Sequence, residues 1–151
     1  MHVPFCDVRC PYCHFTCFAS KDAALFDRWA NGVVEQFARM RDHFHVERLA
    51  SVYVGGGTPT ALTPSARATV TGWLADEIRP LLADDAEITV ECNPESSWPE
   101  SLGPWIEAGV NRISLGLQSM DAGVLKFLGL SLIHISEPTR HICFSRMPSS
   151  A

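Results

Sequence analysis

The first seventeen residues of the chain contain four of its six cysteines. Cys6, Cys10 and Cys13 follow the spacing CxxxCxxC, which is close enough for one loop to wrap three thiolates around a single metal centre. Three sulfur ligands on a four-iron cluster leave one iron without a protein ligand, so that a substrate or cofactor can occupy the open position. The spacing therefore predicts an iron–sulfur centre with an open coordination site.

Cys17 leaves other interpretations of this cluster open. As a fourth ligand it would complete a structural zinc site, although such sites usually pair ligands from two separated knuckles. It would also complete a closed, ferredoxin-like electron carrier, although the bacterial ferredoxin run is CxxCxxCxxxC and has a proline after the last cysteine. Disulfides are the least favoured alternative, because the N-terminus has no export signal.

Two further motifs follow predicted strands. The first is GGGTP, which contains Gly55, Gly56, Gly57 and Thr58; its glycines let a ligand approach the backbone without a Cβ in the way. The second is ECNPE, in which Glu91 can accept hydrogen bonds from ribose hydroxyls. Taken alone, a glycine triplet is more often a turn, and a lone glutamate is more often a solvated acid. Ligands bind at the carboxyl edge of parallel sheets, so we expect these motifs and the cysteines to converge there.

Apolar residues at spacings of three and four predict the helices that position these motifs. The first helix spans residues 21–44, and its apolar stripe is Phe26, Trp29, Val33, Phe37, Met40 and Phe44. A second begins with Thr63 as N-cap and Pro64 at the first helical position, and it buries Val70, Trp73, Leu74 and Ile78. Residues 98–108 form a third, capped by Gly109, and Asp121 opens a fourth.

β-prone runs predict strands at residues 51–54, 87–91 and 112–118. Gln118 ends the last of these runs, and Cys92 is expected to face the core because it alternates with Glu91. Strand and helix alternate with a period of roughly 35 to 40 residues, which is typical of βαβ units. The sequence therefore predicts an α/β fold with a parallel sheet.

Length and charge exclude several classes of protein. The chain has 151 residues, which suits one domain at most, and 12 Lys and Arg against 17 Asp and Glu give a net charge of −5. It lacks the basic stripe of nucleic-acid binders, so we expect no nucleic-acid partner. No apolar run is long enough to span a bilayer, and we expect a cytoplasmic protein.

The last 22 residues, 130–151, have no helical or strand period. Leu130 to Arg140 match the translation of a transposase sequencing adapter, and Ser145 to Ala151 match the flow-cell end of such an adapter, although the join at Phe144 does not fit. The alternative is a real Ser- and Pro-containing tail. We expect residues 1–129 to be a gene fragment and 130–151 to be read-through, so Cys143 carries no functional weight.

The motifs CDVRCPYC, GGGTP and ECNPE together resemble the radical S-adenosylmethionine (radical SAM) superfamily, and the HVPFC entry resembles its coproporphyrinogen III oxidase-like family, HemW-like branch. The resemblance covers residues 2–129. It implies the N-terminal half of a partial (β/α)6 TIM-type barrel, truncated here. It also implies a 4Fe-4S cluster on Cys6, Cys10 and Cys13. The implied SAM contacts are Tyr12, Gly55, Gly56, Gly57, Thr58, Glu91 and Gln118.

The resemblance implies that a reduced cluster cleaves SAM to methionine and a 5′-deoxyadenosyl radical, with electrons from a flavodoxin- or ferredoxin-type reductant. Family members oxidise a porphyrin substrate or act as haem chaperones. Phe15 favours the HemW-like branch, because the porphyrin dehydrogenase has a cysteine at that place. Both haem and porphyrin therefore remain candidate ligands of the full-length protein.

Three departures from the family pattern accompany the resemblance. We expect no strand before the cysteines, because the chain begins at Met1, and the family's arginine after Leu128 and Gly129 is replaced by Leu130. The later strands are also missing. Because a half barrel leaves strand edges unpaired, we expect the 151-residue polypeptide alone to be poorly soluble and inactive.

Overall fold

The computed structural model describes residues 1–130 of the chain. Within this part, four parallel strands form one sheet in the order β1-β4-β5-β6, with bounds His2–Val3, Leu49–Gly56, Leu82–Cys92 and Arg112–Leu115. A separate parallel pair joins β2 (Phe5–Cys6) to β3 (Phe18–Ala19). The α/β class and the parallel sheet are confirmed. The predicted read-through segment, apart from Leu130, lies outside the described residues.

The helices are α1 (Ala23–Phe44), α2 (Pro64–Trp73), α3 (Pro99–Glu107) and α4 (Ala122–Phe127). A π-helical turn, Leu74–Ile78, extends α2, and short 3-10 turns cover Pro59–Ala61, Arg79–Leu81 and Pro94–Ser96. The N-caps follow local chemistry: Asp22 accepts from the amides of Ala24 and Leu25, and Thr63 accepts from that of Ala66. The four predicted helices are thus confirmed within a few residues of their bounds.

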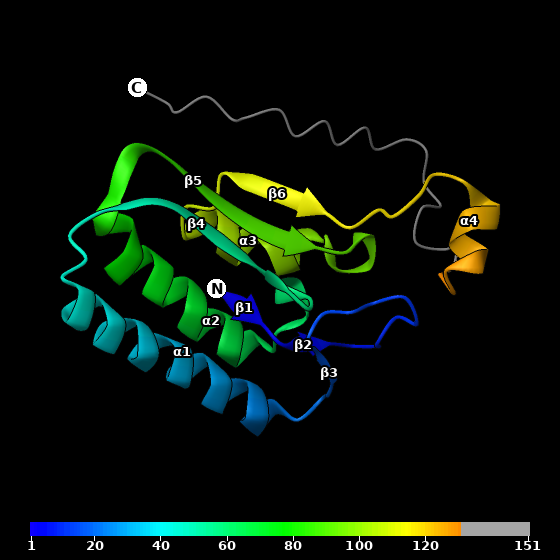
Figure 1. The fold of residues 1–151 in the computed structure, drawn as a ribbon, viewed down its shortest axis with the longest axis horizontal. Helices are drawn as coiled ribbons and strands as arrows, with labels where there is room; N and C mark the ends of the chain where they lie inside the picture. Colours follow the sequence, from blue (N-terminus) through cyan, green and yellow to red (C-terminus); the bar gives the residue numbers. More distant parts are fainter. Residues whose placement is uncertain (131–151) are drawn as a thin grey trace.

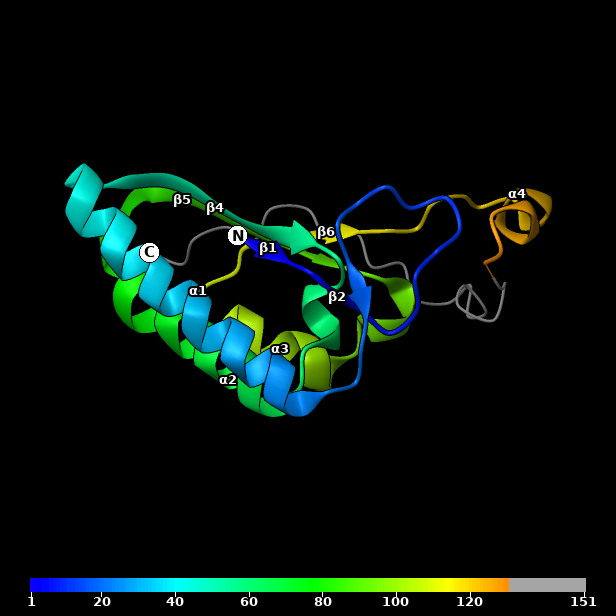
Figure 2. The same cartoon turned by 60° about the horizontal axis from the view of Figure 1, so that its bottom comes forward.

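One face of the sheet carries the hydrophobic core. Helices α1, α2 and α3 all cover this face, and no helix among residues 1–130 covers the opposite face of the sheet (Figures 1 and 2). Val54, Val90 and Trp105 are fully buried between the two layers, and Cys92 is 2% exposed, as predicted for a core cysteine. The predicted inner residues of the second helix, Val70, Trp73, Leu74 and Ile78, are all buried. Because this layer of helices holds the strands in place, it also determines toward which edge of the sheet their carboxyl ends point.

The predicted stripe of the first helix is correct only for its N-terminal part. Phe26 is buried and Phe37 packs against the core, but Met40 and Phe44 are 48% and 64% exposed. Neither Met40 nor Phe44 belongs to the hydrophobic core or packs against it, so the buried part of the stripe ends near Phe37.

Two predicted strand limits at the site are wrong. A strand does precede the cysteines: β1 pairs with β4 through His2↔Gly55 and Val3↔Gly56, since two residues are enough to continue a parallel ladder. The strand at residues 112–118 ends at Leu115, and Gln118 lies beyond it with φ of 62°. β4 and β5 are longer than predicted.

Among residues 1–130, no helix combines the length and the apolar character that crossing a membrane requires.

Gly57 is the glycine of the loop after β4 that tolerates least change. A Cβ placed there would lie 2.3 Å from the carbonyl oxygen of Phe5 and 2.9 Å from that of Val3, both backbone atoms that cannot rotate away. We predict that Gly57→Ala lowers the free energy of unfolding by roughly 1–3 kcal/mol, because overpacking forces the backbone to shift. The measurement is urea unfolding followed by tryptophan fluorescence.

The chain is used for this measurement as a fusion with a soluble carrier protein that lacks tryptophan, so that the four tryptophans of the chain report alone. Gly72→Ala is the matched control, because a Cβ on this helical glycine meets nothing within 4 Å. It should leave stability unchanged or raise it by about 0.5–1 kcal/mol. Equal midpoints for Gly57→Ala and the parent chain would contradict the prediction.

Candidate functional site

A cavity of about 850 Å³ opens at the carboxyl edge of the sheet, where the loops after β2, β4, β5 and β6 meet. In Figure 1 the strand arrows point toward this edge, which the blue loop between β2 and β3 and the orange helix α4 flank. The sequence-predicted residues that line the cavity are Cys6, Cys10, Tyr12, Cys13, Gly56, Gly57, Thr58, Glu91 and Gln118. Segments more than one hundred residues apart thus meet at one place.

The cysteine loop, residues 7–17, is closed at its base by the β2–β3 pair. Phe5 pairs with Phe18 and Cys6 with Ala19, and the amide of Phe18 donates to the carbonyl of Pro4 at 2.7 Å. A turn brings the amide of Cys13 to the carbonyl of Cys10 at 3.1 Å. Because both ends are paired, the loop has a fixed base from which its thiols reach the cavity.

The environment of Cys6 disfavours its thiolate form. Burial raises the pKa of Cys6 to about 11; a hydrogen bond from Thr58 lowers it, and the neighbouring thiols of Cys17 and Cys13 raise it again. The thiols of Cys17 and Cys13 are thus close enough to disfavour ionisation of Cys6, and a cationic centre would favour its thiolate instead. The electrostatics suit a set of metal ligands.

A four-iron cluster fits this donor set better than a single ion does. Among residues 1–130, no three His, Cys, Asp or Glu side chains are placed closely enough to hold one metal ion. A cluster does not require such convergence, because each thiolate binds a different iron. Cys6, Cys10 and Cys13 are half-buried at the cavity, whereas Cys17 is 5% exposed.

The end of β4 and the turn after it, residues 55–58, form the glycine loop, which presents its backbone to the cavity. Gly56 adopts φ of 115°, a left-handed conformation that favours glycine, and its amide donates to Oε2 of Glu91 at 2.8 Å. The amide of Gly57 donates to the carbonyl of Val3 at 2.7 Å. Gly55 does not line the cavity; a Cβ on it would lie 2.4 Å from Oε2 of Glu91, so this glycine makes room for the carboxylate.

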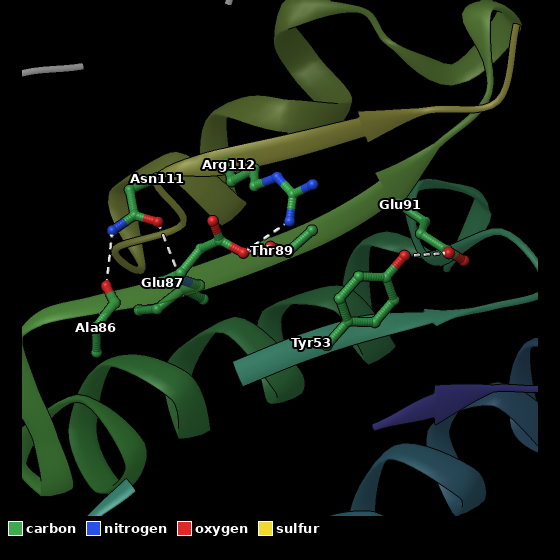
Figure 3. Close-up of polar contacts among 8 residues, drawn as sticks. Tyr53, Ala86, Glu87, Thr89, Glu91, Asn111 and Arg112 are labelled. Atoms are coloured by element: carbon green, nitrogen blue, oxygen red, sulfur yellow. Dashed lines mark hydrogen bonds and ion pairs between the residues drawn. The ribbon is translucent and has the colours of Figure 1, made fainter. Parts of the chain in front are cut away.

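Glu91 is held by two donors from β4. The hydroxyl of Tyr53 donates to Oε1, as Figure 3 shows, while the amide of Gly56 donates to Oε2. The hydrogen bond to this carboxylate is the main reason why the pKa of Tyr53 is raised, because it favours the neutral phenol. The carboxylate is therefore fixed at the cavity wall with its remaining lone pairs available to a ligand.

The two other predicted contact residues line the cavity from different loops. Tyr12 stands between two of the cysteines, and burial, followed by the hydrogen bond with Cys10, raises its pKa to about 12. Gln118 reaches the cavity from the loop after β6 rather than from the strand, and its side-chain amide lies 3.3 Å from where a Cβ on Gly116 would be. Its positive φ turns the chain at that point.

Three residues of the site were not singled out from the sequence. Tyr53 orients Glu91, and Asn93 donates to Thr58 Oγ1 at 3.1 Å. His2 bonds the carbonyl of Thr16 through Nε2 at 2.8 Å, and its ring occupies the space where a Gly56 side chain would lie. Asn93 could have been found from its place in ECNPE, directly after a strand. The contacts of His2 and Tyr53 depend on how neighbouring strands are aligned, which the sequence alone does not specify.

Comparisons with known proteins agree with this arrangement. The model of the family described as the radical SAM superfamily matches residues 1–134. The chain is 38% identical over 130 residues to the heme chaperone HemW of Mycobacterium tuberculosis H37Rv and 35% identical over 131 residues to that of Escherichia coli K12. It is 36% identical over 129 residues to a mitochondrial radical S-adenosyl methionine domain-containing protein 1 of Mus musculus.

These alignments cover 85% of the chain but only 33%, 34% and 28% of the respective relatives, so the chain spans about a third of their length. The solved structure of coproporphyrinogen III oxidase (HemN) from Escherichia coli, described as a radical SAM enzyme, matches 89% of the chain and 31% of its own length. Its TM-score is 0.72 at 23% identity. This likeness confirms the predicted fold, an N-terminal part of a TIM-type barrel.

The contact between Tyr53 and Glu91 leads to a prediction about titration. We predict that Glu91→Gln lowers the pKa of Tyr53 toward its ordinary value of 10.0, because the charged acceptor that favours the neutral phenol is gone. Since the folded-state pKa is raised, the contact stabilises the fold fully below pH 10 or so and loses this contribution as the pH rises through the folded pKa.

The measurement is phenolate absorbance against pH, taken as the difference between each chain and its Tyr53→Phe derivative, which cancels all other tyrosines. Glu107→Gln on α3 removes a charge elsewhere and should leave the Tyr53 curve in place. An identical curve in Glu91→Gln would show that the contact does not govern the phenol.

Proposed function

The chain belongs to the radical SAM superfamily, and on that premise we propose that residues 1–129 hold a 4Fe-4S cluster on Cys6, Cys10 and Cys13 and bind SAM beside it. One observation supports this above all: the three thiols, the glycine loop and Glu91 line a single cavity. Together they offer soft thiolate ligands for iron and oxygen and nitrogen partners for a nucleoside and an amino acid.

Each wall of the cavity has its own task in this proposal. The backbone of Gly56 and Gly57 would meet the amino group of SAM, and Glu91 would accept from the ribose hydroxyls. Tyr12 would pack beside SAM, and Gln118 would bond it from the loop after β6. When both groups are bound, the reduced cluster supplies the electron that splits SAM into methionine and a 5′-deoxyadenosyl radical.

We place the longer protein in the haem pathway, with a HemW-like haem chaperone as the first candidate and a porphyrin oxidase as the second. The identity to HemW proteins supports the first, as does Phe15, which lines the cavity at the place where the resemblance implies a cysteine in a porphyrin dehydrogenase. Haem or porphyrin and a one-electron reductant of the flavodoxin or ferredoxin type are the proposed partners. A cytoplasmic location would keep the thiols reduced.

Family membership speaks against the closed, ferredoxin-like alternative. Cys17 is buried next to β3 and lines the cavity beside Cys6, whose thiol it contacts, so family membership rather than its position distinguishes it from the three proposed ligands. A free buried cysteine of this kind behaves as a small apolar side chain.

We also propose that residues 130–151 are adapter read-through and that residues 1–129 are a partial radical SAM core. The support is the codon-level match of the tail. Sequencing the genomic locus tests it: the adapter codons should be absent, and finding them in genomic DNA would refute the proposal.

The cluster assignment predicts an asymmetry among the cysteines. After anaerobic reconstitution of the carrier fusion, Cys13→Ala should lose most of its iron and sulfide, because a ligand is gone. Cys17→Ala, the matched control, should keep both. The measurements are iron and sulfide content and the absorbance of the cluster.

Addition of SAM should change the paramagnetic spectrum of the reduced cluster in the parent chain and in Cys17→Ala, because one iron is open to it. If Cys17→Ala loses the cluster, or if SAM leaves the spectrum of an intact cluster unchanged, the proposed function is wrong.

A further inference from the structure

The side chain of Thr58 faces the sulfur of Cys6. We infer that Thr58 and Asn93 form a hydrogen-bonded relay to Cys6 that raises the reduction potential of the cluster, which makes Thr58 a positioning residue for the cluster rather than a SAM ligand. The inference rests on the proposed function. The GGGTP motif alone does not indicate that Thr58 influences how easily the cluster accepts an electron.

The direction of the relay follows from its donors. Asn93 Nδ2 donates to Thr58 Oγ1 at 3.1 Å, and an amide nitrogen can only donate. The hydroxyl oxygen is thus the acceptor in that contact, and its own proton remains for the sulfur of Cys6, 3.7 Å away. A hydroxyl that already accepts a hydrogen bond is a better donor, because the two bonds polarise each other.

The relay is held rigidly. Thr58 is 5% exposed, and its amide donates to the carbonyl of Phe5 at 2.7 Å, which fixes its backbone next to β2. On the other side, the amide of Asn93 donates to Oγ of Ser96 at 3.3 Å, and this serine shares a hydrogen bond with Thr60 at 2.5 Å. The hydroxyl therefore has few alternative partners, and the geometry does not depend on a flexible side chain.

The effect on the cluster follows from charge. A donor on a ligating sulfur stabilises the more negative, reduced state more than the oxidised state, and hydrogen bonds to sulfur are among the factors that set cluster potentials. Groups that bond a metal ligand, without touching the metal, commonly tune its properties in this way. Loss of the Thr58 hydroxyl should therefore make the cluster harder to reduce.

The test is the midpoint potential of the reconstituted cluster in the carrier fusion, measured by redox titration without SAM. Thr58→Val keeps the shape but removes the donor, and we expect the iron content to be retained while the reduction equilibrium falls about tenfold, which is about 59 mV for one electron. Thr58→Ser should restore the parent potential. Asn93→Ala should shift it in the same direction by less.

Thr71→Val is the matched control. Thr71 is also a buried threonine, but its hydroxyl bonds the carbonyl of Arg67 within α2, so the potential should not move. If Thr58→Val assembles no cluster, the comparison of Asn93→Ala with the parent decides. Parent-like potentials in Thr58→Val and in Asn93→Ala would overturn the relay while leaving the proposed function intact, whereas failure of the parent chain to assemble any cluster would refute the proposed function itself.

Discussion

The site depends on the close approach of the loop after β4 to the strand that leads into the cysteines. The amides of Gly57 and Thr58 donate to the carbonyls of Val3 and Phe5, both at 2.7 Å. This continues the β1–β4 pairing past the end of the sheet and leaves no space for a side chain at Gly57. Backbone hydrogen bonds thereby set the distance between the glycine loop and the first thiol.

The two faces of the sheet have different chemistry. Val54, Ile88 and Val90 point into the helix-covered core, whereas the opposite face, which none of the described helices covers, carries polar side chains from β4, β5 and β6 (Figure 3). On that face Arg112 bonds Glu87 at 2.7 Å, and both side chains are about half exposed, so the pair contributes at most about 1 kcal/mol. The pair therefore makes this face of the sheet polar but adds little to the free energy of unfolding.

The sequence was sufficient wherever local chemistry decides the structure. Thr63 caps its helix as predicted, since an N-cap needs only its own turn, and the carboxyl edge was found because parallel strands share a direction. It failed at Met40, where exposure depends on how far the rest of the fold covers α1, and at β1, whose existence depends on a distant partner. The Tyr53–Glu91 contact escaped for the same reason, because it is diagonal across a ladder whose register the sequence does not state.

The glycine loop also couples the two halves of the site. Glu91 holds the amide of Gly56, and Thr58, two residues later, bonds the sulfur of Cys6 and accepts from Asn93. Between them stands Gly57, whose amide is fixed to Val3. Each of these three residues is thus held by a backbone hydrogen bond, to Glu91, to Val3 and to Phe5. At Gly57 a side chain would collide with the carbonyl oxygens of Phe5 and Val3, which is why this position requires a glycine.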